Sequence, residues 1–326
     1  MKAMSFSRFG RASEVATLVE IPEPSQPGSG QVLIEVEISP INPSDLLHFA
    51  GRYAQQASLP SYAGSGVLGR VIRSGNDVHL KLGDRVIVLN PQRSAWRERF
   101  VWPVSRLFPL PDADPIALAL LAANPPTALL MLENYCDFRS GDWLIQNAAN
   151  SSVGVSVIQI AKTMGLRTVN IVRRPELANY LGGFGADVTL VDDDELPQQV
   201  TDVVGDGRIR LALDAVAGDA TRRLANCLTD GGTVVNYGLL SGKPCEVDAA
   251  DTVFRDISLR GFWYSRWYSA AAAAAVKALF VRLAAMVRAG TLRVPVEAIY
   301  PVERYTEALA HAERDGRAGK IVMRWS

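Results

Sequence analysis

Residues 142–174 read DWLIQNAANSSVGVSVIQIAKTMGLRTVNIVRR, and this stretch decides the fold. An apolar run, Trp143–Gln146, is followed by a turn of small and polar residues and then by a helix that opens near Val153. After Gly165 the chain returns as a second strand over 168–172. Strand, tight turn, helix and strand in this order predict a crossover unit of a parallel sheet, a unit that often holds a dinucleotide.

The turn ahead of this helix is the candidate phosphate site. Free backbone N–H groups at the start of a helix attract a pyrophosphate, and here they belong to Asn150, Ser151, Ser152 and Val153. The glycine-rich pattern of such turns is degenerate in this chain, because serines replace glycines and only Gly154 is kept. The alternative interpretation is a crossover unit of the same shape that binds no ligand.

The second strand ends on Arg173 and Arg174. In an NAD-binding unit an acidic residue at this position accepts hydrogen bonds from the ribose hydroxyls. Two arginines suit the 2′-phosphate of NADP instead, through charge-assisted contacts, and Pro175 fixes the turn that presents them. The sequence therefore predicts NADPH as the cofactor, with a pair of solvated surface charges as the alternative.

Length, composition and charge narrow the class of protein. A chain of 326 residues exceeds the usual size of a single core, which predicts two domains. Hydrophobic residues make up 48% and the formal net charge is +0, so no charge excess favours nucleic acid or a membrane surface. The three cysteines are scattered without a CxxC pair, and no apolar run reaches membrane-spanning length. Since the N-terminus lacks the apolar core of a signal peptide, we expect a cytoplasmic protein.

Two patterns follow one another along the chain and predict an α/β fold class. Up to about residue 115, prolines and turns separate short β-like runs, which predicts an irregular antiparallel β domain. From there strands alternate with helices as far as a last strand at 258–262, which predicts a doubly wound parallel sheet. A long helix over 270–289 and a tail too small to bury its own core follow. The expected domains are 1–118 with 267–326, and 119–266.

Six motifs are spread over nearly the whole chain: INPSD at 41–45, GDRVI at 83–87, NPPTAL at 124–129, QNAANSSVG at 146–154, GGTVVNYG at 231–238 and RGFWYSRW at 260–267. Together they resemble the zinc-independent medium-chain dehydrogenases/reductases, and within that superfamily the 2-enoyl thioester reductases. GDRVI and GGTVV recur across the superfamily, whereas NPPTAL, QNAANSS and GFWYSRW are more particular to the enoyl reductases. The resemblance implies a GroES-like β domain, a Rossmann domain that binds NADPH, and a homodimer.

Ligand chemistry argues against a metal site. A catalytic zinc needs about three N, S or O ligands from the protein. The histidines of this chain are isolated in sequence, and the first domain has no cysteine cluster. By the resemblance, zinc-using relatives carry a cysteine and a histidine where this chain has Asn42 and Ser65. We therefore expect no metal.

Tyr53 is the candidate catalytic residue. Its GRY context resembles the GxY segment that carries the catalytic tyrosine of the enoyl thioester reductases. An ordinary phenol stays protonated at neutral pH, so it can donate a hydrogen bond or a proton to a developing enolate. The alternative is a loop tyrosine that only packs or binds the cofactor.

The resemblance assigns further cofactor contacts. Asn124, in NPPTAL, matches a position at the nicotinamide end of the cofactor, with a locally satisfied helix break as the alternative. Lys320, in GRAGKIVM, matches a lysine that reaches the cofactor, with an exposed lysine as the alternative. Two strand ends complete the expected set, with Tyr237, Gly238, Leu239 and Leu240 after one and Phe262, Trp263, Tyr264 and Ser265 after the next. Aromatic residues in such a run also suit a core or a subunit interface.

These observations predict NADPH-dependent reduction of 2-enoyl thioesters carried by coenzyme A or acyl carrier protein. Hydride would pass to the β-carbon, and Tyr53 would donate or orient the proton for the α-carbon. A quinone or alkenal reductase of the same fold is the first alternative, and a weakly catalytic NADPH-binding protein with a structural, sensing or RNA-binding role is the second. The resemblance also implies pairing of two copies through the strand near 258–263.

Overall fold

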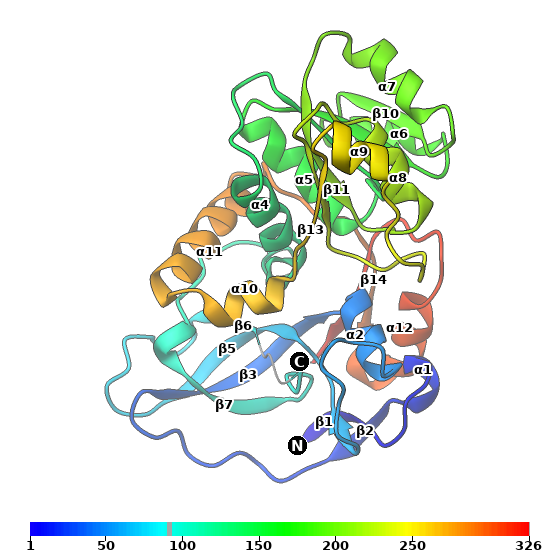
Figure 1. The fold of residues 1–326 in the computed structure, drawn as a ribbon. Helices are drawn as coiled ribbons and strands as arrows, with labels where there is room; N and C mark the ends of the chain where they lie inside the picture. Colours follow the sequence, from blue (N-terminus) through cyan, green and yellow to red (C-terminus); the bar gives the residue numbers. More distant parts are fainter. Residues whose placement is uncertain (90–92, 326) are drawn as a thin grey trace. The chain divides into compact units, whose positions relative to one another are not determined.

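The computed structural model describes residues 1–89 and 93–325. They form two compact units, 1–126 with 265–326 and 127–264 (Figure 1). The first boundary between the two units lies at residue 126, later in the chain than the boundary at 118 that the sequence predicts. The reason is the 3₁₀ helix Leu120–Ala122, which is buried and packs on strands of the first unit.

The first unit is built from two mainly antiparallel sheets. Its strands are β1 (Lys2–Phe6), β2 (Thr17–Glu20), β3 (Gln31–Pro40), β4 (Ser61–Tyr62), β5 (Gly66–Ser74), β6 (Arg85–Leu89), β7 (Arg99–Pro103), β14 (Val296–Pro301) and β15 (Lys320–Arg324). The larger sheet has the order β14-β15-β3-β5-β6 with β7 paired to β3, and the smaller has the order β2-β1-β4. This irregular β unit confirms the first half of the predicted fold class.

Strand β3 organises the larger sheet. Its side chains alternate, so that Val32, Ile34 and Val36 are fully buried in the core of the unit. One edge of β3 pairs with β5. The other edge is shared by two strands, with Gln31–Glu35 next to β7 and Ile38–Pro40 next to β15. The C-terminal tail is therefore part of the sheet of the first unit.

Several helices belong to the first unit. They are α1 (Ala12–Val15), α2 (Pro43–Phe49), α3 (Pro115–Ala119), α10 (Tyr264–Ala270), α11 (Ala273–Arg288) and α12 (Tyr305–Ala312). Helix α2 has no counterpart in the sequence prediction. Its start is nevertheless marked in the sequence, by Pro43 in the first turn and by a capping box between Asn42 and Asp45.

Two predicted helix boundaries are wrong. The helix predicted over 270–289 is α11, and it begins three residues later, at Ala273, because the backbone of Ala272 is extended; Ala270 instead ends α10. The break predicted at 124–126 lies one residue earlier, at Ala123. The Asn-Pro-Pro run instead opens α4 (Asn124–Asn134), because proline is accepted in the first turn of a helix.

The second unit contains a parallel sheet. Its strands are β8 (Trp143–Gln146), β9 (Arg167–Val172), β10 (Val188–Val191), β11 (Ile209–Asp214), β12 (Thr233–Asn236) and β13 (Ser258–Gly261). They follow the order β10-β9-β8-β11-β12-β13, and each neighbouring pair is parallel. This is the strand order of a doubly wound dinucleotide-binding sheet, which confirms the second half of the predicted fold class. The predicted last strand is β13, at one edge of the sheet.

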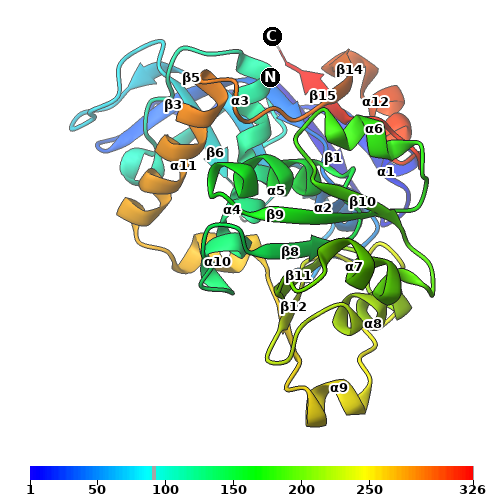
Figure 2. The ribbon, with the colours of Figure 1, turned by 90° about the horizontal axis from the view of Figure 1, so that it is seen from above.

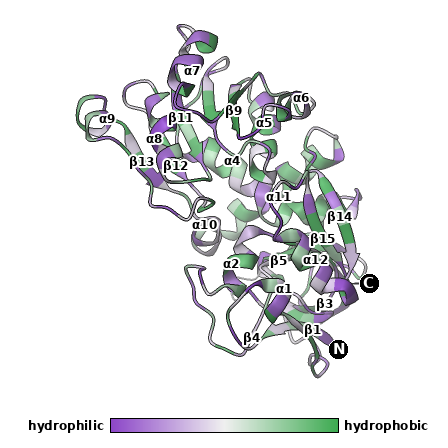
Figure 3. Ribbon diagram, turned by 90° about the vertical axis from the view of Figure 1, so that its right-hand side faces the viewer, coloured by the Kyte–Doolittle hydropathy of each residue, from purple (hydrophilic) through white to green (hydrophobic). Residues whose placement is uncertain are grey.

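Helices cover both faces of the parallel sheet (Figure 2). They are α5 (Ser152–Thr163), α6 (Leu177–Gly182), α7 (Leu196–Val204) and α8 (Asp219–Asn226). The short helix α9 (Ala249–Phe254) projects away from the sheet (Figure 2). One hydrophobic cluster joins Val169 of β9 to Leu196 of α7 and Leu224 of α8, and another contains Val155 of α5 and Leu181 of α6. In Figure 3 hydrophobic residues gather on strands such as β9, and hydrophilic residues are frequent on α8. The sequence prediction lacks α7 and α9.

No single helix in residues 1–89 and 93–325 combines the length and the apolar composition of a membrane span. Residues 115–122 and α4 form two helices joined at a bend, and together they have the length and the apolar composition of a membrane span. In this structure residues 118–122 and 128–132 of the two helices are buried.

Candidate functional site

The predicted cofactor contacts of the second unit lie at the carboxyl ends of its strands. Ligands of doubly wound sheets bind at this edge, next to the point where the strand order reverses, which here lies between β8 and β11. Four sets of residues follow four of the strands. After β8 come Asn150, Ser151, Ser152 and Val153, and after β9 come Arg173 and Arg174. After β12 come Tyr237, Gly238, Leu239 and Leu240, and after β13 come Phe262, Trp263 and Tyr264. The fold thus brings residues that are distant in sequence to one edge of one sheet.

The N-terminus of α5 offers free hydrogen-bond donors. Ser151 is the N-cap, and its Oγ accepts from the N–H of Gly154 at 3.1 Å. The N–H groups of Ser152 and Val153 have no acceptor within the described part of the chain. Gly154 permits a close approach of the turn to the helix, since a Cβ there would lie 2.4 Å from the carbonyl oxygen of Ala149. This arrangement suits a pyrophosphate, and the contact itself stays a prediction.

A buried carboxylate, Asp214, ties three strand ends of this edge together. It ends β11 and is fully buried. Its Oδ1 accepts from the amide of Asn147 at 2.6 Å and from the N–H groups of Val216 and Ala217, and its Oδ2 accepts from Thr221 at 2.7 Å and from Asn236 at 3.1 Å. Sequence reasoning missed this group. The available signal was a polar residue at the end of each of three apolar strands.

The turn after β12 is shaped by a close backbone approach. A Cβ at Gly238 would lie 2.4 Å from a main-chain oxygen of the turn after β11, so glycine is required there. The phenol of Tyr237 is buried beside Ser151, and burial raises its pKa. Leu239 and Leu240 are exposed at 57% and 61%. An apolar surface is therefore open where the sequence places the cofactor.

Arg173 and Arg174 are both exposed at the end of β9. The Nε of Arg174 lies 3.7 Å from the carboxylate of Glu176, a loose pair between exposed side chains. In residues 1–89 and 93–325 the side chain of Arg173 has no ion pair or hydrogen bond. Both guanidinium groups are accessible to an anion, and their contact with a 2′-phosphate stays a prediction.

The aromatic run after β13 is partly packed within the second unit. The ring of Phe262 meets that of Tyr135 edge-on, with 6.2 Å between the centroids. Tyr135 is itself held by β13, because its hydroxyl donates to the carbonyl oxygen of Gly261 at 2.9 Å. Trp263 and Tyr264 are half-buried. The structure therefore gives Phe262 a packing role, and its contact with the cofactor stays a prediction.

In the first unit, Tyr53 is held between two partners. Its hydroxyl lies 3.2 Å from the Oγ of Ser265, and either atom can be the donor. The guanidinium of Arg93 lies over the ring, with 4.2 Å from its Cζ to the ring centroid, which is a cation–π distance. Ser265, predicted as a cofactor contact, is thus the hydrogen-bond partner of the candidate catalytic residue.

Asn42 links two other predicted residues of the first unit. Its Oδ1 accepts from the Nζ of Lys320 at 2.6 Å and from the Nδ2 of Asn124 at 3.1 Å. Lys320 also donates to the carbonyl oxygen of Ile41 at 3.2 Å. Because this ammonium group is buried among neutral acceptors, burial lowers the pKa of Lys320 to about 7. The alternative of an exposed lysine is wrong, and the amide of Asn124 is satisfied by Asn42, a residue 82 positions away in sequence, rather than by its own helix.

The resemblance aligns Asn42 and Ser65 with the zinc ligands of zinc-using relatives. Both side chains are engaged in hydrogen bonds within the first unit. Asn42 accepts from the lysine and the asparagine described above, and the hydroxyl of Ser65 donates to the carboxylate of Asp45 at 2.8 Å. Asp45 in turn is paired with Arg93 at 2.7 Å. Among the residues that the structure describes, no group of three or more His, Cys, Asp or Glu side chains could hold a metal ion.

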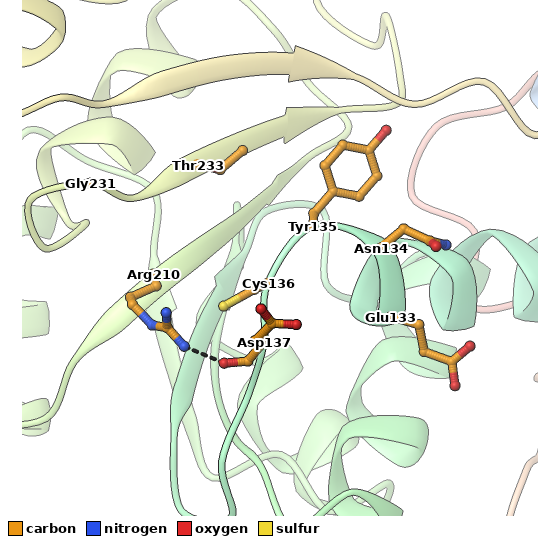
Figure 4. Close-up of a pocket in the computed structure, with 8 residues that line it drawn as sticks. All are labelled: Glu133, Asn134, Tyr135, Cys136, Asp137, Arg210, Gly231 and Thr233. Atoms are coloured by element: carbon orange, nitrogen blue, oxygen red, sulfur yellow. Dashed lines mark hydrogen bonds between the residues drawn. The ribbon is translucent and has the colours of Figure 1, made fainter.

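A cavity of about 320 Å³ lies elsewhere in the second unit (Figure 4). It is lined by Glu133, Asn134, Tyr135, Cys136, Asp137, Arg210, Gly231 and Thr233. Arg210 and Thr233 lie near the amino ends of β11 and β12. The cavity is therefore at the opposite end of these strands from the predicted cofactor contacts, and no predicted site residue lines it.

Comparison with known proteins agrees with this architecture. The model of the alcohol dehydrogenase GroES-like domain matches residues 28–112, and that of the zinc-binding dehydrogenase matches residues 152–280. A mitochondrial 2-enoyl thioester reductase from Candida tropicalis is similar in structure, with a TM-score of 0.88, 23% identity and 99% of both chains covered. The quinone oxidoreductase of Escherichia coli, solved with NADPH, has a TM-score of 0.88, 21% identity and full coverage of both chains. At these identities the likeness shows a shared fold.

Sequence relatives of similar length extend the comparison. The mitochondrial enoyl-[acyl-carrier-protein] reductase of Rattus norvegicus is 34% identical over 316 residues, which are 95% of this chain and 84% of that protein. The protein of the same name from Homo sapiens is 34% identical over 330 residues, with 99% and 88% covered. One from Caenorhabditis elegans is 36% identical over 273 residues, with 82% and 79% covered. The chain therefore belongs to the medium-chain dehydrogenase/reductase family, in its group of enoyl-[acyl-carrier-protein] reductases.

Proposed function

We propose that this protein reduces the double bond of 2-enoyl thioesters with NADPH. NADPH supplies the hydride for the β-carbon, the negative charge moves to the thioester carbonyl oxygen, and a proton is added at the α-carbon. The products are NADP⁺ and the saturated acyl thioester, so one hydride and one proton balance the reaction. Full-length relatives that carry the name of this activity support the proposal. The observation that carries it in this structure is the phenol of Tyr53, held by two neighbours.

Tyr53 has the acid–base role in this proposal. Its hydroxyl donates a hydrogen bond, or its proton, to the charge that develops when hydride arrives. A donor aimed at that charge stabilises the transition state more than the ground state, and therefore raises kcat. Ser265, 3.2 Å away, keeps the hydroxyl oriented when no substrate is bound.

The second unit holds the cofactor in this proposal. The free N–H groups of Ser152 and Val153 bind the pyrophosphate, and the exposed guanidinium groups of Arg173 and Arg174 bind the 2′-phosphate. Asn124 and Lys320 remain proposed contacts of the cofactor, and their shared bonds to Asn42 fix both side chains. The remaining predicted contacts, Asn150, Tyr237, Gly238, Leu239, Leu240, Phe262, Trp263 and Tyr264, line the strand ends described above.

Substrate choice is the decisive test. We would follow NADPH oxidation with crotonyl-CoA and longer enoyl thioesters, with a quinone, and with a small alkenal. Reduction of the thioesters, at a kcat/KM well above those for the other two, is the expected result. Preference for the quinone or alkenal would replace the proposal by the first alternative. No oxidation with any acceptor, despite NADPH binding, would favour a binding protein.

Tyr53→Phe tests the role of the phenol. We expect kcat for an enoyl thioester to fall by at least about tenfold, since positioned general acids contribute about a hundredfold or more. Tyr300→Phe is a matched control in the same unit, because Tyr300 also has a hydrogen-bonded hydroxyl, paired with the ring of His311 at 3.0 Å. An unchanged kcat for Tyr53→Phe would remove the residue from the mechanism.

Oligomeric state and compartment are separate proposals. We infer a homodimer from the family, and light scattering of the purified protein would distinguish it from a monomer of 35.3 kDa. We infer a cytoplasmic location because all three cysteines are free and suit a reducing compartment. The names of the relatives place those proteins in mitochondria, so fractionation of the source cells decides between the two compartments.

A further inference from the structure

We propose that Arg93, held by Asp45, is a positioning residue that fixes the ring of Tyr53 for proton donation. The inference rests on the proposed function, because it gives a partner to the residue that carries the acid–base role. Arg93 and Asp45 act through the tyrosine and are assigned no contact with the substrate or the cofactor. The two residues lie 48 positions apart in sequence, and neither belonged to the predicted site.

The loop that carries Tyr53 cannot fix the ring by itself. Helix α2 ends at Phe49 and β4 begins at Ser61, and between them the chain forms turns and bends without regular secondary structure. Residues 54–56 next to the tyrosine are exposed. The orientation of the phenol therefore depends on side-chain contacts that reach it from other parts of the unit.

Arg93 can provide a fixed surface because its guanidinium is buried and tied down. Its side chain is 4% exposed, and its Nη2 lies 2.7 Å from the Oδ1 of Asp45 and 3.3 Å from the Oγ of Ser44. Desolvating such a pair is costly, and it is stable only when the geometry is good and other hydrogen bonds complete it. Arg93, anchored through its Nη2 while its buried Nε has no hydrogen-bond partner among the described residues, therefore presents a planar cation to the ring 4.2 Å away.

Asp45 is itself held from two sides. Its Oδ2 accepts from the N–H of Asn42 at 2.9 Å, as part of the capping box of α2. Its Oδ1 accepts from the N–H and the hydroxyl of Ser65 at 3.2 and 2.8 Å. The carboxylate therefore links the start of α2 to the segment just before β5, and Arg93 extends this link to Tyr53. A desolvated cation–π contact is stronger than an exposed one, so the stack can hold a loop residue.

A double-mutant cycle tests the inference. Arg93→Lys keeps a cation beside Asp45 and removes the planar face under the ring. We expect kcat for crotonyl-CoA to fall by about tenfold, with the KM values for crotonyl-CoA and NADPH changed less than about twofold, because positioning of the phenol matters in the transition state. In the Tyr53→Phe background the same substitution should change kcat by less than about twofold, since no hydroxyl is left to position.

Controls separate this inference from the proposed function and from unfolding. Arg304→Lys is matched, because Arg304 also lies over a tyrosine ring, that of Tyr300, and pairs with a carboxylate at the exposed surface of the same unit; it should leave kcat unchanged. If Arg93→Lys does not fold, Asp45→Asn with Arg93→Gln removes both charges and enters the same cycle. If Arg93→Lys lowers kcat equally in the native protein and in the Tyr53→Phe background, the inference is overturned and the proposed function still stands. No loss in Tyr53→Phe itself would overturn both.

Discussion

Each unit of the molecule contains one fully buried aspartate close to predicted site residues, Asp45 in the first and Asp214 in the second, and the two are stabilised differently. Asp214 of the second unit accepts hydrogen bonds from neutral donors only, two side-chain amides, one hydroxyl and two backbone N–H groups. Asp45 of the first unit has backbone and hydroxyl donors as well, but its closest partner is a cation, Arg93. The hydrogen bonds around Asp214 involve only its own donors, whereas Asp45 contacts Arg93, which in turn lies over the ring of Tyr53.

This difference indicates different roles for the two carboxylates. The donors of Asp214 come from the ends of β8, β11 and β12 and from α8, so its charge holds the edge of the sheet at which the cofactor contacts are predicted. Neutral donors are sufficient for that purpose. Asp45 instead orients a side chain that must keep its own charge. We therefore expect removal of Asp214 to affect stability first, and removal of Asp45 to be correctable by neutralising its partner.

The largest effect is expected from Asp214→Ala. The substitution leaves several buried donors without an acceptor, and each unsatisfied donor costs about 1–3 kcal/mol. We expect the free energy of unfolding to fall by on the order of 4 kcal/mol or more, measured by urea denaturation followed by tryptophan fluorescence. Thr221→Val, which removes one donor at 2.7 Å from the carboxylate, is the matched control and should cost much less. If the two substitutions lowered the free energy of unfolding equally, the carboxylate would not be what holds these donors together.

Asp45→Asn should be the next largest. It leaves the guanidinium of Arg93 buried without a counter-charge, which costs about 3 kcal/mol by analogy with other broken buried pairs. Adding Arg93→Gln should recover at least about half of that loss, because it removes the uncompensated charge. The same urea experiment measures both variants. A double variant as unstable as the single one would mean that the pair contributes little and that Asp45 resembles Asp214 after all.

Local patterns in the sequence predicted much of the second unit and little of these networks. Strand β8 and the start of α5 follow from the apolar run and the small residues at 143–154, because these depend on neighbours in sequence. Parallel strands then bring their carboxyl ends to one edge, so the predicted contacts of the second unit fall together. The contact of Arg93 with Asp45 spans 48 residues, and that of Lys320 with Asn42 spans 278. Periodicity carries no information about such pairs, since they form only when separate strands and loops pack.

The missed helix α2 and the wrong start of α11 have a related cause. Helix α2 has only seven residues, and its capping box lies within a stretch in which prolines and β-like runs dominate the local pattern. The alanine tract at 270–275 favours a helix at every position, so nothing local marks the extended backbone of Ala272. Both errors lie in the first unit, in which irregular loops rather than periodic elements carry Tyr53.

The third prediction concerns the two exposed arginines that follow β9, Arg173 and Arg174, and the preference for NADPH over NADH. Arg173→Ala together with Arg174→Ala should raise the KM for NADPH by about thirtyfold and leave the KM for NADH nearly unchanged, because only NADPH has the 2′-phosphate. Steady-state kinetics with both cofactors and one enoyl thioester measures the change. Arg208→Ala is the control, since Arg208 is an exposed arginine at the amino end of β11. If both cofactors are affected alike, the two arginines do not select NADPH.

The buried cation of the first unit gives the smallest expected effect, a dependence of stability on pH. Burial lowers the pKa of Lys320 in the folded chain to about 7, with the charge of Arg317 acting in the same direction and that of Asp45 against it. The unfolded lysine keeps its ordinary pKa of 10.5, so between these values the unfolded chain binds the extra proton. The free energy of unfolding should therefore rise with pH, by about 1 kcal/mol from pH 7 to pH 8 through this group.

Lys320→Met isolates that contribution. Methionine has a similar length and no charge, and Asn42 keeps its bond from the amide of Asn124. Urea denaturation at pH 7 and pH 8 should show a slope for the native protein that exceeds the slope for the variant by about 1 kcal/mol, and the variant should gain stability at pH 7 relative to the native chain. Equal slopes would show that Lys320 keeps an ordinary pKa in the folded protein. In that case the ammonium of Lys320, like the guanidinium of Arg93, would be a permanent buried charge of the first unit, held by the neutral acceptors Asn42 and Ile41 rather than by a carboxylate.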